Sequence, residues 1–180
     1  MTAGGVTSFE IMAREGIDIV LRHGTGVRDP LATKSPYSVL IELSSQRTEG
    51  LRESMEQILA AGLEKGLVLD ATICDSLEQA KTFWRIRELF GEMQGREGGS
   101  IKHDVSVPVA KIPAFIEEAN AAAIKLIPGC RPMPFGPAEI ERQVAYQVGA
   151  AQALAAELGA EAGLVGAADL VRRDVAESAA

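Results

Sequence analysis

The segment REGGSIKHDVSVP, residues 96–108, carries the clearest fold signal in the chain. Two glycines open it, a proline closes it, and apolar and polar residues alternate between them. This period of two is that of a β-strand, in which successive side chains point to opposite faces of a sheet. One face would carry Ile101, His103, Val105 and Val107, and the other Lys102, Asp104 and Ser106. Such a polar row suits either a binding surface or the solvated face of an antiparallel sheet, and the pattern alone does not separate the two.

The elements around this strand predict an α+β fold. Helices are expected over residues 7–24, where Thr7 and Glu10 have capping-box spacing, and over 51–63, 77–94 and 112–127. Strands are expected over residues 38–43, 67–74, 101–107 and 131–135. This order favours a ferredoxin-like antiparallel or mixed sheet with helices mainly on one face. A dinucleotide-binding fold is disfavoured because no strand is followed by Gly-x-Gly-x-x-Gly.

Residues 137–180 are rich in alanine and differ in composition from the rest of the chain. Apolar residues recur there at steps of three and four, which predicts an amphipathic helix. They are Ile140, Val144, Val148, Ala151, Leu154 and Leu158. We expect this helical tail to cap the sheet, and the alternative is self-association with another copy of the chain. The expected domains are therefore 1–136 and a tail of 137–180.

Composition excludes several classes of function. The chain has 180 residues and a formal net charge of −7, with no basic run, which disfavours nucleic-acid binding. No apolar run approaches the roughly 20 residues that span a bilayer, and the N-terminus does not resemble a secretory signal. Cys74 and Cys130 are far apart and suit a reducing compartment. We therefore expect a cytoplasmic protein with no nucleic-acid or membrane partner.

Six phrases, in one order along the chain, make a family resemblance visible. They are TSFEIM (7–12), DIVLRHGTGVRDPLA (18–32), SVLIELSS (38–45), GLVLDATICDS (66–76), WRIRE (84–88) and REGGSIKHDVSVPVAKIPAFIEE (96–118). In these phrases the chain resembles the C-terminal substrate domain of FAD-linked oxidases and dehydrogenases of the vanillyl-alcohol-oxidase type. The most similar branch comprises the D-lactate, glycolate and D-2-hydroxyglutarate dehydrogenases.

The resemblance implies a role in oxidation of a D-2-hydroxy acid. In that family a separate N-terminal domain carries the FAD, and the C-terminal domain closes over the flavin ring and holds the substrate. Arg87 and Lys102 correspond to the cations that grip the substrate carboxylate, which suits a planar guanidinium and an ammonium. Without the resemblance, the simpler interpretation of Arg87 is a surface ion pair with Glu88 or Glu92. Gly91 departs from the small hydroxyl residue that the family often has near this point.

A larger departure follows Gly136. There the family pattern continues as His-x-Gly-Asp-Gly-Asn-x-His, which supplies metal ligands and a proton acceptor, but this chain reads GPAEIERQVAYQ (136–147). The sequence holds two histidines, His23 and His103, too far apart for one local metal motif. We therefore expect no bound metal, no catalytic residue and no FAD on this chain alone.

These observations lead to a fragment or subunit of an FAD-dependent D-2-hydroxyacid dehydrogenase that supplies substrate-carboxylate binding. We expect it to be inactive alone, and its partners would be a small 2-hydroxy acid and a separate flavin-domain polypeptide. The alternatives are a non-catalytic ferredoxin-like module for binding or dimerisation, and a relic without function.

Overall fold

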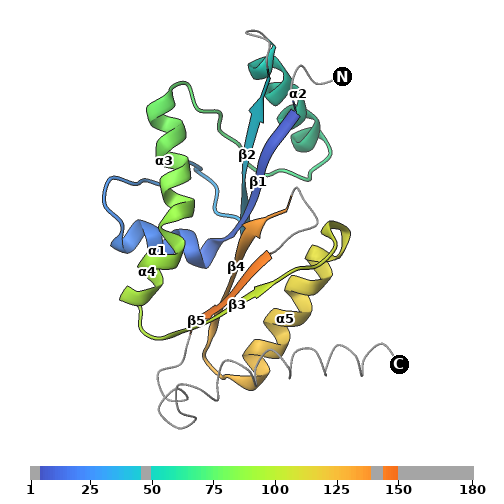
Figure 1. The fold of residues 1–180 in the computed structure, drawn as a ribbon. Helices are drawn as coiled ribbons and strands as arrows, with labels where there is room; N and C mark the ends of the chain where they lie inside the picture. The colour runs from blue at the N-terminus through green and yellow to red at the C-terminus, as the bar shows by residue number, and fades with distance from the viewer. Residues whose placement is uncertain (1–4, 46–49, 139–143, 150–180) are drawn as a thin grey trace.

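An antiparallel sheet with flanking helices forms the fold (Figure 1). The computed structural model describes residues 5–45, 50–138 and 144–149. Within them, five strands form one sheet in the order β2-β1-β4-β5-β3, and every neighbouring pair is antiparallel. The predicted α+β class is confirmed. The strands are β1 (Gly5–Ala13), β2 (Tyr37–Ser44), β3 (Ser100–Val105), β4 (Arg131–Pro137) and β5 (Val144–Gly149). The helices are α1 (Arg14–His23), α2 (Leu51–Glu64), α3 (Leu77–Glu88), α4 (Phe90–Met93) and α5 (Ile112–Leu126).

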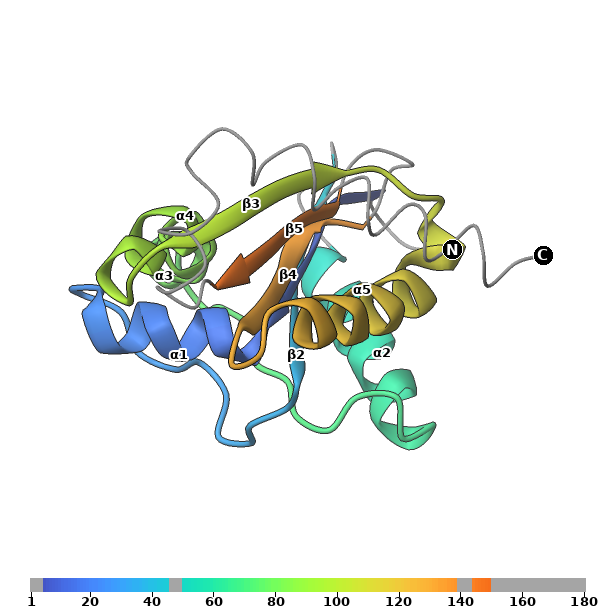
Figure 2. The ribbon, with the colours of Figure 1, turned by 90° about the horizontal axis from the view of Figure 1, so that it is seen from below.

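The sheet has a hydrophobic cluster on each face. Met12 and Phe135 are register partners on β1 and β4, and both belong to a cluster with residues of α1, α3 and α4. Ile11, the neighbour of Met12, points the other way and packs against Ile112 and Ile116 of α5. The helices therefore occupy both faces, with α5 opposite α1, α3 and α4 (Figure 2). No helix in the described part of the chain is long and apolar enough to cross a bilayer.

The strand in residues 96–108 is confirmed as β3, and so is its alternation. Lys102 and Asp104 are exposed, while Ile101, His103 and Val105 are partly buried. Ile101 and Val105 pack against α5, which covers the apolar side of the strand. The predicted strands at 38–43 and 131–135 and the helices at 51–63 and 112–127 are also confirmed as β2, β4, α2 and α5. The predicted helix at 77–94 divides into α3, α4 and a 3-10 turn, Gln94–Arg96.

The prediction that a helix begins at Thr7 is wrong, because residues 5–13 form the strand β1. The Thr7 hydroxyl does not cap a helix and donates instead to the backbone carbonyl of Glu42 on β2 at 3.3 Å. Two polar side chains, Ser8 and Glu10, point with Met12 toward the buried face. Because the buried face of this strand is mostly polar, the apolar residues do not mark it, and the strand period is hidden in the sequence.

The strand predicted over 67–74 is also wrong, and this segment lies outside the sheet. The backbone N–H groups of Leu67 and Val68 both donate to the carbonyl of Gly62, at 2.9 Å and 3.2 Å. These bonds close the C-terminal end of α2 and remove two donors that a strand would need. Leu67 and Leu69 remain 78% and 67% exposed, so the apolar run does not enter a core.

The helix predicted for the tail is contradicted over residues 144–149, which form β5. This strand pairs with β3 along one edge and with β4 along the other. The backbone groups of β5 are thereby hydrogen-bonded on both sides. A helix in that position would leave the facing backbone groups of β3 and β4 without these partners. Its composition, VAYQVG, contains the β-branched and aromatic residues that strands favour. The remaining tail positions of that prediction, Ile140 and those from residue 150 on, lie outside the described residues.

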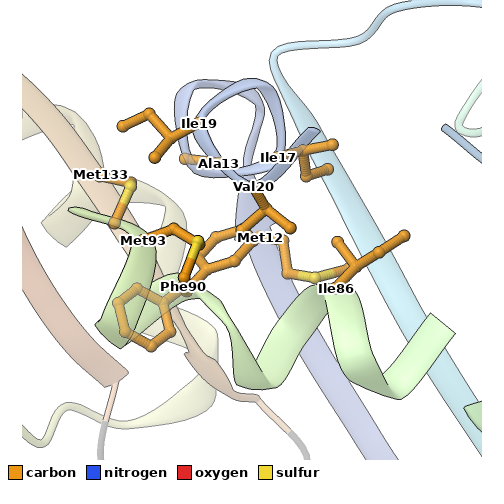
Figure 3. Close-up of a cluster of buried hydrophobic side chains, with 10 residues drawn as sticks. Met12, Ala13, Ile17, Ile19, Val20, Ile86, Phe90, Met93 and Met133 are labelled. Atoms are coloured by element: carbon orange, nitrogen blue, oxygen red, sulfur yellow. The ribbon is translucent and has the colours of Figure 1, made fainter. Parts of the chain in front are cut away.

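Phe90 is the centre of the cluster between the sheet and α1 (Figure 3). It is fully buried, and its ring meets that of Phe135 edge-on, with centroids 5.2 Å apart. Gly16 on α1 lies directly against this ring, where an added Cβ would come closer than 3.0 Å to ring carbons. The glycine therefore lets α1 approach α4.

Gly16→Ala is expected to lower the free energy of unfolding by about 1–3 kcal/mol, because Phe90 cannot move aside without disturbing the core. Helix propensity alone predicts the opposite sign, a gain of about 0.5–1 kcal/mol. Gly91→Ala is the matched control, since Gly91 is also helical and a Cβ there meets nothing within 4 Å. Urea denaturation of the two variants should give opposite signs, and a stabilised Gly16→Ala would contradict the packing described.

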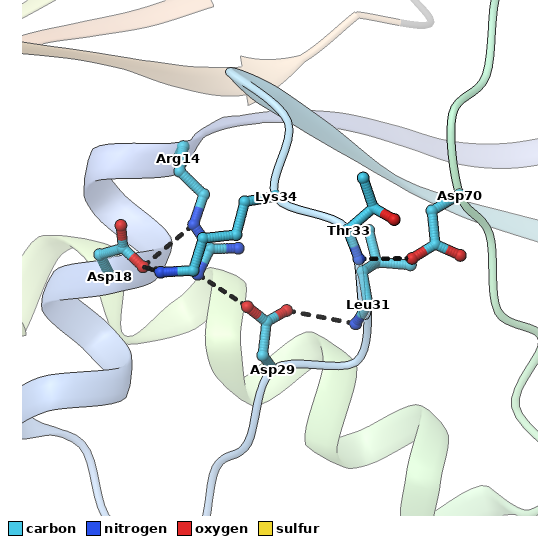
Figure 4. A network of polar contacts seen from close by, with 7 residues as sticks. All are labelled: Arg14, Asp18, Asp29, Leu31, Thr33, Lys34 and Asp70. Carbon is cyan, nitrogen blue, oxygen red and sulfur yellow. Dashed lines mark hydrogen bonds and ion pairs between the residues drawn. The ribbon is translucent and has the colours of Figure 1, made fainter.

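Ion pairs fix the loop between α1 and β2 (Figure 4). Arg14 at the start of α1 contacts Asp18 at 2.5 Å and Asp29 in the loop at 2.7 Å. The hydrogen bond from Arg14 lowers the pKa of Asp18. Further along the loop, the backbone N–H of Thr33 donates to Asp70 at 2.8 Å, which lowers the pKa of Asp70. The loop is thus held to α1 at one end and to the segment after α2 at the other.

Candidate functional site

Arg87, predicted to bind a carboxylate, lies near the C-terminal end of α3 and is mostly buried. Its Nε donates to Glu10 Oε2 on β1 at 2.5 Å, and the two side chains are 20% and 11% exposed. Its guanidinium carbon lies 4.6 Å from the centroid of the Phe135 ring on β4, which is cation–π geometry. The simpler interpretation, a surface pair with Glu88 or Glu92, is not what the structure has. Arg87 is anchored instead to two central strands.

Lys102, the second predicted cation, is exposed on β3 and reaches the same helical junction. Its Nζ donates to the backbone carbonyl of Gly91 at 3.1 Å, one helical turn beyond Arg87. The backbone register pairs Lys102 with Gln147, and Gln147 with Met133. Residues paired directly across a sheet share a face. Lys102 therefore lies on the face that carries Met133 and Phe135, which is also the face that Arg87 covers.

A guanidinium and an ammonium on one face, near one helical junction, can bind an anion. Arg87 offers a planar fork of N–H donors, which matches the two oxygens of a carboxylate, and Lys102 adds a mobile point charge. Gly91 between them is exposed and carries no side chain that could donate to a ligand. We call this arrangement of Arg87, Lys102 and the Gly91 backbone the two-cation site.

His103 does not belong to the two-cation site, because it lies on the opposite face of β3. Burial lowers the pKa of its imidazole, as expected for a histidine half-covered on the α5 side. His23 lies at the end of α1 and contacts Glu97. The described residues hold no group of three or more His, Cys, Asp or Glu side chains suited to a metal. The absence of a bound metal stays a prediction.

A second cluster, not expected from the sequence, surrounds Glu97. Its carboxylate contacts Arg22, His23 Nε2 at 2.5 Å and Arg131 Nη2 at 3.1 Å, and Arg131 also contacts Glu15 at 2.8 Å. The hydrogen bonds from His23, Arg22 and Arg131 lower the pKa of Glu97 from 4.5 to about 2. These residues come from three distant parts of the sequence, namely α1, the segment around Glu97 and β4, and no motif links them. A cavity of about 20 Å³ beside Glu97 has room for roughly one water.

The Glu97 cluster fixes the connection that places Lys102 relative to Arg87. Glu97 lies between the end of α4 and the start of β3, and its partners lie on α1 and β4. We expect Glu97→Gln to lower stability near neutral pH and to flatten its acid dependence. Because the folded-state pKa is depressed, the contribution of Glu97 is present above about pH 4.5 and is lost as the pH falls toward 2.

Urea denaturation of parent and Glu97→Gln at several pH values between 7 and about 2 would test this. The difference in the free energy of unfolding between parent and Glu97→Gln should be largest near pH 7 and should shrink below pH 4.5. Glu117→Gln, on the exposed side of α5, is the control for losing one surface carboxylate. A difference between parent and Glu97→Gln that is constant over the whole pH range would contradict the role of the cluster.

Residues 1–136 match the family described as FAD linked oxidases, C-terminal domain. Relatives include the mitochondrial D-2-hydroxyglutarate dehydrogenase of Arabidopsis thaliana, 38% identical over 113 residues, which are 63% of this chain and 20% of that protein. The D-2-hydroxyglutarate dehydrogenase of Stutzerimonas stutzeri is 34% identical over 119 residues, 64% of this chain and 24% of that protein. The mitochondrial enzyme of Rattus norvegicus is 30% identical over 107 residues, 59% and 20% respectively. This chain thus spans about a fifth to a quarter of the length of these relatives.

Proposed function

Because this chain belongs to the family of FAD-linked oxidase C-terminal domains, we propose that it supplies the substrate-carboxylate site of a D-2-hydroxyacid dehydrogenase. The two-cation site carries the proposal, since Arg87 and Lys102 lie on one face at one helical junction. The relatives named above are D-2-hydroxyglutarate dehydrogenases, which makes D-2-hydroxyglutarate the first substrate to test. In a chain with a net charge of −7, local cations are what would draw in an anionic substrate.

The proposal assigns distinct roles to the two cations. Arg87, fixed by Glu10 and Phe135, would orient the carboxylate through paired hydrogen bonds. Lys102, exposed and attached to a flexible stem, would close on the bound acid and supply charge. Gly91 would leave open the space beside the carboxylate that a larger residue would fill.

FAD enters the proposal only through the family, in which the bound flavin accepts the hydride. In that family a separate N-terminal domain carries the flavin. We therefore assign the flavin to a part of the enzyme outside the described residues, either another domain or a separate polypeptide, and expect this chain to have no dehydrogenase activity alone. A cytoplasmic location remains part of the proposal, although the plant and rat relatives are named as mitochondrial.

One observation favours the alternative of a non-catalytic module. Arg87 already has a carboxylate partner in Glu10, so its charge is balanced without any ligand. In that case the pair would only hold α3 on the sheet, and the chain would not discriminate between an acid and its neutral analogue.

Isothermal titration of the purified chain with D-lactate and with D-lactamide separates the two functions. The amide has nearly the shape of the acid but no charge. A carboxylate site should bind D-lactate at least about tenfold more tightly, since a charge-assisted hydrogen bond contributes about 1.5–3 kcal/mol. Equal affinity for the two compounds, or binding of neither, would favour the non-catalytic module.

A further inference from the structure

Glu10 is a charged residue in a buried position, where desolvation disfavours a carboxylate. It lies on β1, a strand with neighbours on both sides, and the whole residue is 8% exposed. Its side chain points to the same face as Met12, toward the main hydrophobic cluster. Buried ion pairs are often no more stabilising than well-packed apolar residues, because desolvation offsets their attraction. The stability of the fold therefore gives little reason for a glutamate at this position. The effect of Glu10 on the orientation of Arg87 gives a better one.

The contact between Glu10 and Arg87 involves one specific edge of the guanidinium. Glu10 Oε2 accepts a hydrogen bond from Nε, and the guanidinium carbon lies over the Phe135 ring, 4.6 Å from its centroid. A guanidinium has five N–H donors, of which one is on Nε and four are on the two terminal nitrogens. Among the described residues, Arg87 donates no hydrogen bond from its terminal nitrogens. Glu10 thus fixes the inner edge and leaves the outer edge, Nη1 and Nη2, for a second carboxylate.

We propose that Glu10 is a positioning residue, which fixes Arg87 so that its outer edge is presented to the carboxylate of a 2-hydroxy acid. The inference rests on the proposed function and names the residue that orients its principal cation. Two contacts restrict the rotations that would misalign the fork: the hydrogen bond that Nε donates to Glu10, and the Phe135 ring, whose centroid lies 4.6 Å from the guanidinium carbon. The opposite possibility is that Glu10 competes with the substrate for Arg87 and must leave before it binds.

Glu10→Asp distinguishes the two, because it keeps the charge and withdraws the carboxylate by one methylene. If Glu10 positions Arg87, the affinity of the chain for D-2-hydroxyglutarate should fall about tenfold, the effect of one misaligned hydrogen bond to a charged group. If Glu10 competes, the shorter side chain releases Arg87 and the affinity should rise. Asp104→Glu on β3 is the control for a change of one methylene in an exposed acid on the same face.

A second measurement covers the case in which Glu10→Asp does not fold. In the parent chain, the Arg87 Nε–H resonance should be protected from solvent exchange and should stay protected when D-2-hydroxyglutarate saturates the protein. Loss of that protection on binding, or tighter binding by Glu10→Asp, would overturn the inference and leave the proposed function standing. No binding of D-2-hydroxyglutarate by the parent chain would overturn both.

Discussion

Phe90→Ala is expected to lower the free energy of unfolding by about 3–5 kcal/mol, which is the range for removing a fully buried aromatic side chain. Phe90 is 0% exposed, so none of its apolar surface is already in water. Its ring lies against Gly16 and meets Phe135 edge-on, and therefore joins α1, α4 and the sheet. The surrounding backbone consists of a helix and a strand, which cannot collapse freely into the space left behind.

Urea denaturation followed by circular dichroism measures this loss, and Phe90→Leu is the control. Leucine keeps most of the apolar volume, so its cost should be clearly smaller, about 1–1.5 kcal/mol. A loss below about 1 kcal/mol for Phe90→Ala would contradict the position of Phe90 at the centre of the core. Phe90→Ala could also alter ligand binding, because Phe90 packs against Phe135 and Phe135 contacts Arg87. Binding by this variant should therefore be measured only on folded protein, so that a loss of stability is not counted as a loss of affinity.

Lys102→Ala is expected to weaken the binding of a 2-hydroxy acid about tenfold to a hundredfold, with little change in folding. A hydrogen bond to a charged group contributes about 1.5–3 kcal/mol, which converts to that range of Kd. Lys102 is exposed, and its Nζ donates to the backbone carbonyl of Gly91 at 3.1 Å, so the free energy of unfolding should change by less than about 0.5 kcal/mol.

Lys125→Ala is the matched control for Lys102→Ala, because it removes the same charge from α5, on the other side of the sheet. Both variants change the net charge equally, so general electrostatic attraction falls equally in both. Titration calorimetry should give a Kd close to that of the parent for Lys125→Ala, raised only by the loss of one distant charge, and a much higher Kd for Lys102→Ala. Equal weakening in the two variants would show that Lys102 acts only through overall charge.

Periodicity predicted the elements whose buried face is apolar. In β3 the residues that point to α5 are apolar or histidine and the others are polar or charged, so the strand and its two faces follow from spacing alone. In β1 the buried residues include Ser8 and Glu10, and the strand was predicted as a helix. In β5 the same valines fit steps of four and steps of two, and pairing with β3 and β4 decides between them. Tertiary context outweighed local pattern in both strands.

The residues of the candidate site likewise fall into those that the sequence could predict and those that it could not. Arg87 and Lys102 could be named in advance because they lie in phrases that resemble a family. Their supports could not, since Glu10 lies 77 positions from Arg87 and Glu97 lies 74 and 34 positions from His23 and Arg131. Such contacts depend on how the sheet brings distant strands together. No residue spacing in a single sequence indicates these long-range contacts.

Carboxylate binding through Arg87 is tested most directly by calorimetric titration of D-2-hydroxyglutarate into the purified chain and its Arg87→Lys variant. Lysine keeps the charge and a partner for Glu10, but it has no planar fork for a carboxylate. We expect saturable binding of one molecule per parent chain, weakened by added salt, and a Kd at least about tenfold higher for the variant. No saturable heat from the parent chain, or the same Kd for parent and variant, would contradict it.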